Sequence, residues 1–179
     1  MIRLFVGLEL PAPVKAALLA SMGGVAGARW QRDEQLHLTL RFIGEVDRHQ
    51  AQDIAAALGR VNVRPFAAEL AGPGLFDHRG RIDSLWVGVR PVEPLAALAK
   101  AVNAALAGVG IPPEPRAFVP HISVARGRGM IGAASWPHSP IPRLGWTVKN
   151  FCLFDSILTP DGSRYAVLAR WPEGSGAPI

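Results

Sequence analysis

Apolar residues recur along this chain with two different periods. Over residues 36–42, apolar and polar side chains alternate strictly (Leu-His-Leu-Thr-Leu-Arg-Phe), which predicts a strand with one face in a core. Over residues 93–107, leucine and valine recur at every third or fourth position, which predicts a helix, and Gly108 follows its end. Both patterns occur elsewhere in the chain, so we expect a mixture of strands and helices.

Two further helices are expected where the sequence carries signals for helix ends. One opens at Pro11–Val14, because proline suits a first helical turn, and runs to about Met22. The other covers residues 48–58, with Asp47 as its N-cap and Gln50 completing a capping box. Together with the helix over residues 93–107, the sequence therefore predicts three helices.

The remaining apolar or alternating segments are expected to be strands, at residues 2–8, 36–42, 65–71, 83–89, 117–125, 145–154 and 164–170. Residues 72–80 and 160–162 carry turn signals, and residues 126–144 are rich in glycine, proline and serine, which indicates a long exposed loop. Because strands and helices do not alternate regularly, we expect the α+β class, in one domain that covers residues 1–179.

The composition excludes several classes of protein. A single cysteine, Cys152, cannot form an internal disulfide or a cysteine-based zinc site, and in its apolar segment we expect it to be buried and inert. The apolar run at residues 2–8 is too short for a signal peptide, and no stretch approaches the roughly 18 apolar residues that span a bilayer. We therefore expect a soluble cytoplasmic protein that does not enter a membrane.

Basic residues exceed acidic ones, 19 against 14, and 16 of the basic residues are arginines. Arginine is the better bidentate partner for phosphate, but an arginine-rich genome would produce the same excess. The sequence has no run of consecutive Lys or Arg, which excludes a polybasic nucleic-acid tail. Any phosphate site must therefore gather arginines that are scattered along the sequence.

The clearest chemical signal is a tetrad that occurs twice, as His-Leu-Thr-Leu at residues 37–40 and as His-Ile-Ser-Val at residues 121–124. Alternate side chains of a strand share a face. The histidine and hydroxyl of each tetrad are therefore expected to point outward, while the aliphatic residues and Phe42 point into the core. Solvent-facing residues on ordinary strands would explain one such tetrad, but two favour a single cleft with two imidazoles and two hydroxyls.

Two imidazoles can catalyse transfer at phosphorus or at a carbonyl, one as general base and the other as general acid, because histidine titrates near neutral pH. The hydroxyls can donate hydrogen bonds to oxygens on which charge develops. No carboxylate stands beside either tetrad, so we expect no metal centre and no other cofactor. From the residues alone, either histidine can be the acid.

The tetrads and their surroundings resemble the 2H phosphoesterase superfamily, and in particular its RNA 2',3'-cyclic phosphodiesterases, first named 2',5'-RNA ligases. The resemblance covers nearly the whole chain, through residues 29–30, 42–46, 85–89, 116–126, 156–158 and 162–165. One departure is Ser123, where the family usually has threonine, so the hydroxyl is kept but the methyl that stiffens its rotamer is lost.

This resemblance implies a bilobal fold, with two pseudo-symmetric antiparallel-sheet lobes and outer helices around a central cleft. It also implies metal-independent hydrolysis of an RNA or nucleoside 2',3'-cyclic phosphate to a 2'-phosphate, with reversible ATP-independent ligation in some members. By the same resemblance, His37 is the proton donor to the leaving 3'-oxygen and His121 is the proton acceptor that activates water. Thr39 and Ser123 would bind the non-bridging oxygens.

Three more residues are candidates for substrate binding. Arg126 resembles the family's phosphate-contacting arginine, although strand parity turns it outward only if a bulge or turn intervenes. Phe118 is expected either to stack on the terminal base or to pack in the core. Arg41 shares the parity of His37, so we expect it either to reach the cleft or to pair with Glu45.

The expected partners are RNA ends or cyclic nucleotides, bound by a monomer with no obligate protein partner. Arg128 and Arg143 are candidates for steering RNA phosphates. We assign no catalytic role to the other histidines, His49, His78 and His138. Two other functions stay open: a non-catalytic module that binds RNA ends, and a 2H phosphodiesterase for another cyclic phosphate, such as ADP-ribose 1'',2''-cyclic phosphate.

Overall fold

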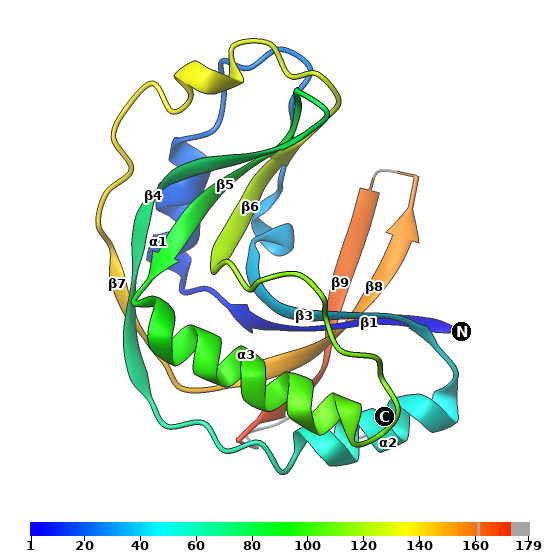
Figure 1. Cartoon of the computed structure of the whole chain (residues 1–179). Coiled ribbons are helices and arrows are strands. Elements are labelled where there is room, and N and C mark those ends of the chain that lie inside the picture. Colours follow the sequence, from blue (N-terminus) through cyan, green and yellow to red (C-terminus); the bar gives the residue numbers. More distant parts are fainter. Residues whose placement is uncertain (161, 173–179) are drawn as a thin grey trace.

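The computed structural model of the protein describes residues 1–160 and 162–172 (Figure 1). Its strands are β1 (Ile2–Glu9), β2 (Arg29–Trp30), β3 (His37–Val46), β4 (Phe66–His78), β5 (Arg81–Arg90), β6 (His121–Arg126), β7 (Gly145–Val148), β8 (Phe151–Thr159) and β9 (Gly162–Trp171). Its helices are α1 (Ala12–Ala20), α2 (Arg48–Leu58) and α3 (Val92–Ala107), with short 3₁₀ turns η1 (Asp33–Gln35) and η2 (Ala133–Ser135).

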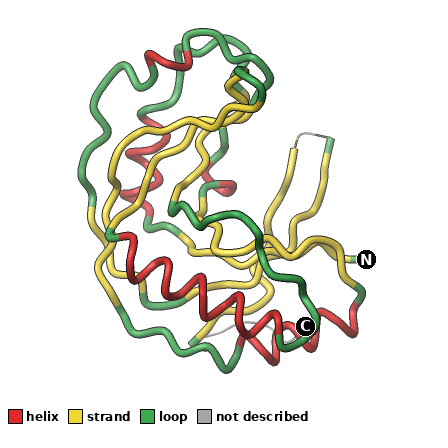
Figure 2. The backbone as a smooth tube through the Cα atoms, in the orientation of Figure 1, coloured by secondary structure: helices red, strands yellow, loops and turns green. Residues whose placement is uncertain are grey.

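The strands of the described residues form one antiparallel sheet in the order β7-β4-β5-β6-β3-β1-β8-β9, and β2 pairs with β6 beside this path. At its centre, β3 and β6 meet through a single residue pair, Leu38 with Ile122. The sheet therefore has two halves, one with β1, β3, β8 and β9 and the other with β2 and β4 to β7. The sheet curls, so that its two halves face each other (Figures 1 and 2). This is the bilobal α+β arrangement that the resemblance implied.

The helices lie where the sequence signals predict them. Asp47 caps α2, because its carboxylate accepts a hydrogen bond of 2.8 Å from the Gln50 N–H, and Gly59 follows the last turn. α1 ends at Ala20, two residues earlier than expected. α2 and α3 pack against each other, and α3 also packs against β3, so these helices support the strand that carries the first tetrad. No helix in the described residues is long and apolar enough to cross a membrane.

The hairpin of β4 and β5 is longer than the sequence predicts. Residues 72–78 continue β4 instead of forming a loop, β5 begins at Arg81, and the register shifts between Leu70 and Pro73. A shift of this kind accommodates a proline, which has no N–H for the ladder. The tight turn is at Arg79 and Gly80, both of which have a positive φ.

Two other strand predictions are corrected. Residues 117–120 precede β6 instead of belonging to it. Residues 145–154 form two strands, since β7 pairs with β4 in one half of the sheet and β8 pairs with β1 in the other. The expected turn at residues 160–162 includes Asp161, which lies outside the described residues.

The core follows the aliphatic positions of the strands, including Leu38, Leu40, Ile122 and Val124, which are all buried. Cys152 is buried as expected, and burial raises the pKa of its thiol to about 12. The aliphatic positions of both tetrads therefore anchor their strands, and the histidine and hydroxyl positions are left to the other face.

Candidate active site

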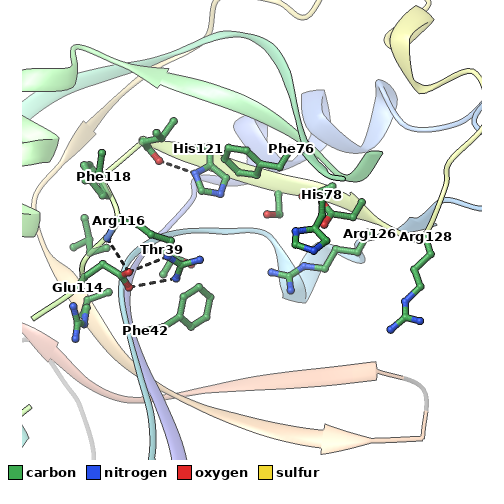
Figure 3. A pocket seen from close by; sticks show the side chains of 18 of the residues that line it. Thr39, Phe42, Phe76, His78, Glu114, Arg116, Phe118, His121, Arg126 and Arg128 are labelled. Carbon is green, nitrogen blue, oxygen red and sulfur yellow. Dashed lines mark hydrogen bonds and ion pairs between the residues drawn. The ribbon is translucent and has the colours of Figure 1, made fainter. Parts of the chain in front are cut away.

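Side chains from both halves of the sheet line a cavity of about 1550 Å³ (Figure 3). Six of the seven site residues proposed from the sequence line it: Thr39, Arg41, Phe118, His121, Ser123 and Arg126. The seventh, His37, contacts a residue of this wall, because its Nε2 lies 3.0 Å from the Thr39 hydroxyl oxygen. The fold therefore brings the two tetrads to one place.

His121 stands at the start of β6, beside the aromatic rings of Phe76 and Trp86, whose centroids are 5.0 and 5.7 Å from its own. Its Nδ1 is 2.6 Å from the Val119 carbonyl oxygen. Burial lowers the pKa of His121, the bond to Val119 opposes this shift, and the nearby Arg126 charge lowers the pKa further. The lowered pKa favours the neutral form of the His121 imidazole in the free protein.

His37 stands at the start of β3 in a more enclosed aromatic setting. Its ring centroid lies 4.7 Å from that of Phe5 and 4.9 Å from that of Tyr165. Its Nδ1 is 2.7 Å from the Gln35 carbonyl oxygen. Burial lowers the pKa of His37 to about 4, against the bond to Gln35, and the charge of Arg126 lowers it further. Arg126 thus acts electrostatically on both imidazoles.

The two imidazoles are held in the same way. A carbonyl oxygen can only accept a hydrogen bond, so Nδ1 of each ring must carry the proton that it donates to the residue two positions earlier. In the neutral form this leaves Nε2 without a proton in both rings. The Thr39 hydroxyl therefore donates to Nε2 of His37 in the free protein.

Register places the tetrads side by side. Leu38 pairs with Ile122 across antiparallel strands, so the residue after Leu38 lies next to the residue before Ile122. Thr39 is therefore adjacent to His121, and His37 is adjacent to Ser123. Each histidine has a hydroxyl from the opposite tetrad beside it, as one phosphate-binding site would require.

Each tetrad ends in a β-bulge at its fourth residue. Gly7 pairs with Thr39 and Val6 with Arg41, which leaves Leu40 as the extra residue of β3. On β6, Trp86 pairs with Ser123 and Leu85 with Ala125, which leaves Val124 as the extra residue. A bulge shifts the alternation of side chains by one position, so the fifth residue after each histidine turns to the cleft.

These bulges explain how Arg126 and Phe42 reach the cavity. Arg126 is exposed and lines the cavity. Strand parity turns this residue outward only if a bulge or turn intervenes, and the bulge at Val124 is that irregularity. Phe42, expected in the core, is instead 47% exposed and lines the cavity (Figure 3). Its position could have been found from the sequence, because Phe42 follows His37 by the same five residues that separate Arg126 from His121.

Arg41 does not share the outward face of His37, because the bulge turns it inward. Only 7% of its surface is exposed at the cavity wall. Its guanidinium donates to Asn103 Oδ1 at 2.9 Å and to the Pro112 carbonyl oxygen. Among the ion pairs of the described residues, the pair with Glu45 that the sequence allowed is not formed. Arg41 ties β3 to α3 and to the segment that leads into β6.

The rest of the wall is aromatic and basic. Phe118 is half-buried at the end of the cavity that also holds an exposed ion pair, Arg116 with Glu114 at 2.9 Å. Arg128 lines the opposite end together with His78, a histidine to which the sequence assigned no role (Figure 3). Within residues 1–160 and 162–172, no group of three or more His, Cys, Asp or Glu side chains is placed to hold a metal ion.

Comparison with known proteins identifies the class of this fold and site. The crystal structure of E. coli LigT complexed with 3'-AMP superposes with a TM-score of 0.81, at 28% identity, over 95% of this chain and 97% of that one. The crystal structure of TT0787 from Thermus thermophilus gives a TM-score of 0.77, at 31% identity, over 94% and 96%. The fold is that of the 2H phosphoesterases.

Sequence comparison gives the family. The model of the 2'-5' RNA ligase superfamily matches residues 15–157. The RNA 2',3'-cyclic phosphodiesterase of Thermus thermophilus is 34% identical, over 94% of this chain and 89% of its own length. The enzyme of that name from Escherichia coli is 30% identical, over 94% and 95%. The protein therefore belongs to the 2'-5' RNA ligase superfamily.

Proposed function

We propose that this protein is an RNA 2',3'-cyclic phosphodiesterase that works through two histidines. The observation that carries the proposal is the pair of imidazoles whose Nδ1–H groups are both held by backbone carbonyls. Because Nδ1 of each ring is engaged by the backbone, Nε2 of each ring is the atom that can exchange a proton with the substrate. The relatives of this name from Thermus thermophilus and Escherichia coli align with more than nine-tenths of the chain, and this supports the choice of reaction.

In the proposed reaction, water attacks phosphorus and the P–O3' bond breaks, so the product has a 2'-phosphate and a 3'-hydroxyl. Nε2 of His121 takes the proton of the water, and Nε2 of protonated His37 gives a proton to the leaving 3'-oxygen. Thr39 turns its hydroxyl from His37 to a non-bridging oxygen, and Ser123 donates to the phosphate as well. Exchange with solvent then restores both histidines.

Arg126 has two effects in this scheme. Its charge lowers the pKa of both histidines in the free protein, and it supplies a cation where the substrate phosphate is negative. When phosphate neutralises that cation, the pKa of the acid imidazole rises, so uptake of the catalytic proton accompanies substrate binding. His37 is the more deeply buried histidine, so it takes up a proton less readily than His121 does. A mechanism with His121 as the acid and His37 as the base uses the same geometry.

The cavity also supports ligation as a second reaction. If the 5'-hydroxyl of another RNA strand takes the place of water, His121 removes its proton and the 3'-oxygen leaves as before. The product is a 2',5'-phosphodiester, and ATP is not required because the cyclic phosphate is itself the activated group. The description of the matching family, 2'-5' RNA ligase, favours this candidate.

The direct test is to incubate the protein in EDTA with cytidine 2',3'-cyclic phosphate, with an RNA that ends in a 2',3'-cyclic phosphate, and with ADP-ribose 1'',2''-cyclic phosphate. We expect the first two to give 2'-phosphates, identified by chromatography against 2'- and 3'-phosphate standards. Tight binding of the RNA end without any product would identify a binding module instead. Turnover of the ADP-ribose compound alone would identify a different 2H phosphodiesterase.

A further inference from the structure

Arginines are concentrated around the cavity. Eight of the sixteen in the chain line it: Arg3, Arg29, Arg41, Arg79, Arg81, Arg116, Arg126 and Arg128. The acidic residues that line it are Asp83 and Glu114, and Glu114 is paired with Arg116. An arginine-rich genome explains a high count but not this gathering. Of the eight, only Arg116 forms an ion pair within the described residues, so the cavity has uncompensated positive charge.

Three of these cations lie at one end of the cavity, beyond Arg126, and we call them the distal arginines: Arg79, Arg81 and Arg128. Arg81 pairs with His78 at the tip of the β4–β5 hairpin, whereas Arg29 pairs with Arg126 across β2 and β6 and lies beside it. The Gly127 N–H donates to the Asp83 carbonyl oxygen at 3.0 Å, which holds the segment with Arg128 against this hairpin. Phe118, Arg116 and Glu114 lie on the other side of His121 (Figure 3).

The distal arginines are too far along the strands to act on the reacting phosphate together with Arg126. Five residues separate His121 from Arg126, which corresponds to about 15 Å of strand. The charge of Arg126 still acts on both histidines. Ser84 pairs with Arg126, so the hairpin tip with Arg79 and Arg81 lies farther out still. A nucleoside cyclic phosphate has one phosphate group, so it leaves the distal arginines without an anion.

We infer that the distal arginines bind the phosphates of the nucleotides that precede the cyclic end. This inference rests on the proposed function, because the terminal phosphate must lie at the histidines. The substrate class is then an RNA strand of several nucleotides, which runs in its 5' direction from His121 toward the turn between β4 and β5. Its backbone charges match the row of guanidinium groups, and release of counterions drives its binding.

The inference is tested by binding, so the result does not depend on turnover. The probes are uridine 2'-phosphate and a uridine hexanucleotide that ends in a 2'-phosphate, with dissociation constants measured at several salt concentrations. The variant is Arg79→Asn combined with Arg81→Gln. Asparagine suits the positive φ of 54° at Arg79 and its position before Gly80, so the hairpin turn is kept.

We expect the natural protein to bind the hexanucleotide at least tenfold more tightly than the mononucleotide. Each phosphate contact with a single strand contributes about 0.7 to the slope of log affinity against log salt, so loss of two contacts lowers that slope by about 1.4. The double variant should lose most of the advantage of the hexanucleotide. A hexanucleotide with neutral methylphosphonate linkages should bind the natural protein like the mononucleotide.

The matched control is Arg60→Gln combined with Arg64→Gln, which removes the same charge from two exposed arginines outside the cavity. Equal binding of both probes by the natural protein would overturn the inference, and so would an equal loss in the control variant. Competition by hexaglutamate as effective as that by RNA would indicate an acidic protein ligand instead. Hydrolysis of cytidine 2',3'-cyclic phosphate by the same preparations reports separately on the proposed function.

Discussion

The two strands that carry the histidines have the same backbone arrangement but differ in the side chains that surround each histidine. In both, the histidine opens the strand, Nδ1–H is held by the carbonyl two residues earlier, and a bulge follows at the fourth residue of the tetrad. His37 is enclosed by aromatic rings and bonded to Thr39. His121 lies on the cavity wall, and its strand continues to Arg126 where β3 has Phe42.

This comparison shows how a repeated motif can give two different acid–base groups. The backbone sets where each imidazole points, and it does so equally on both strands. The side chains nearby set how readily each imidazole takes a proton, and burial lowers the pKa of His37 to about 4. Unequal surroundings are what an acid and a base need if each imidazole is to keep its own role.

The largest expected effect comes from the histidines themselves. His37→Ala and His121→Ala should each lower kcat/KM by about 10²- to 10⁴-fold, the usual scale of general acid–base catalysis. A substrate with sulfur in place of the 3'-oxygen then separates their roles, because a thiolate leaves without needing a proton. On that substrate the rate of His37→Ala should return toward that of the natural protein, while His121→Ala stays slow.

Rescue of His121→Ala instead would reverse the assignment of acid and base. Near-normal activity of both variants on the natural substrate would contradict the two-histidine mechanism. Retained binding of a 2'-phosphate product by both variants is the control for folding.

The next largest effect is expected at Arg126. Arg126→Gln should lower kcat/KM by about 10- to 100-fold, the scale of a charged hydrogen bond. Because the Arg126 charge lowers the pKa of both histidines, its loss should raise both. A base with a higher pKa stays protonated to a higher pH, so the acidic limb of the pH profile of kcat/KM should move upward. NMR titration of the imidazoles measures the same shift directly.

Arg143→Gln is the matched control, since Arg143 is exposed and does not line the cavity. An unchanged acidic limb in Arg126→Gln, together with a normal rate, would contradict the role that we give to Arg126.

Much of the fold could be predicted because local signals decide it. The cap at Asp47 and the periodicity of residues 93–107 mark their helices without reference to the rest of the chain. The division of residues 145–154 into two strands could not be predicted, since it depends on which strand each part pairs with. Pairing partners are a property of the whole sheet and leave little trace in a single segment.

The site was predictable to the extent that side chains alternate regularly. Alternation correctly predicted that Leu38 and Ile122 are buried behind the cleft face. It failed for Arg41 and Phe42, because the bulge at Leu40 shifts the pattern by one residue. A bulge depends on the register with a neighbouring strand, so strict alternation can be trusted only up to the fourth residue of each tetrad.

A smaller effect is expected at Phe42, the counterpart of Arg126 on β3. Its exposed ring on the cavity wall is suited to stack on the terminal base, and loss of such stacking usually weakens binding by about tenfold. Phe42→Ala should therefore raise KM by about tenfold with little change in kcat. The same variant should leave KM unchanged for a cyclic phosphate of an abasic ribose.

An equal effect of Phe42→Ala on the abasic substrate would show that the ring acts on the phosphate site and not on the base. Thermal unfolding is the control, because an exposed side chain contributes little to the core and its removal should leave the melting temperature nearly unchanged.

The smallest effect should come from making the two tetrads alike. Ser123 and Thr39 occupy matching positions and both line the cavity, but serine lacks the methyl group that restricts rotation about χ1. Ser123→Thr should raise kcat/KM by about twofold, because fewer rotamers must be given up when its hydroxyl binds phosphate. Thr39→Ser should lower it by a similar factor. A tenfold loss in Ser123→Thr would mean that the added methyl clashes beside His37, and that the two halves of the cleft are less alike than their backbones.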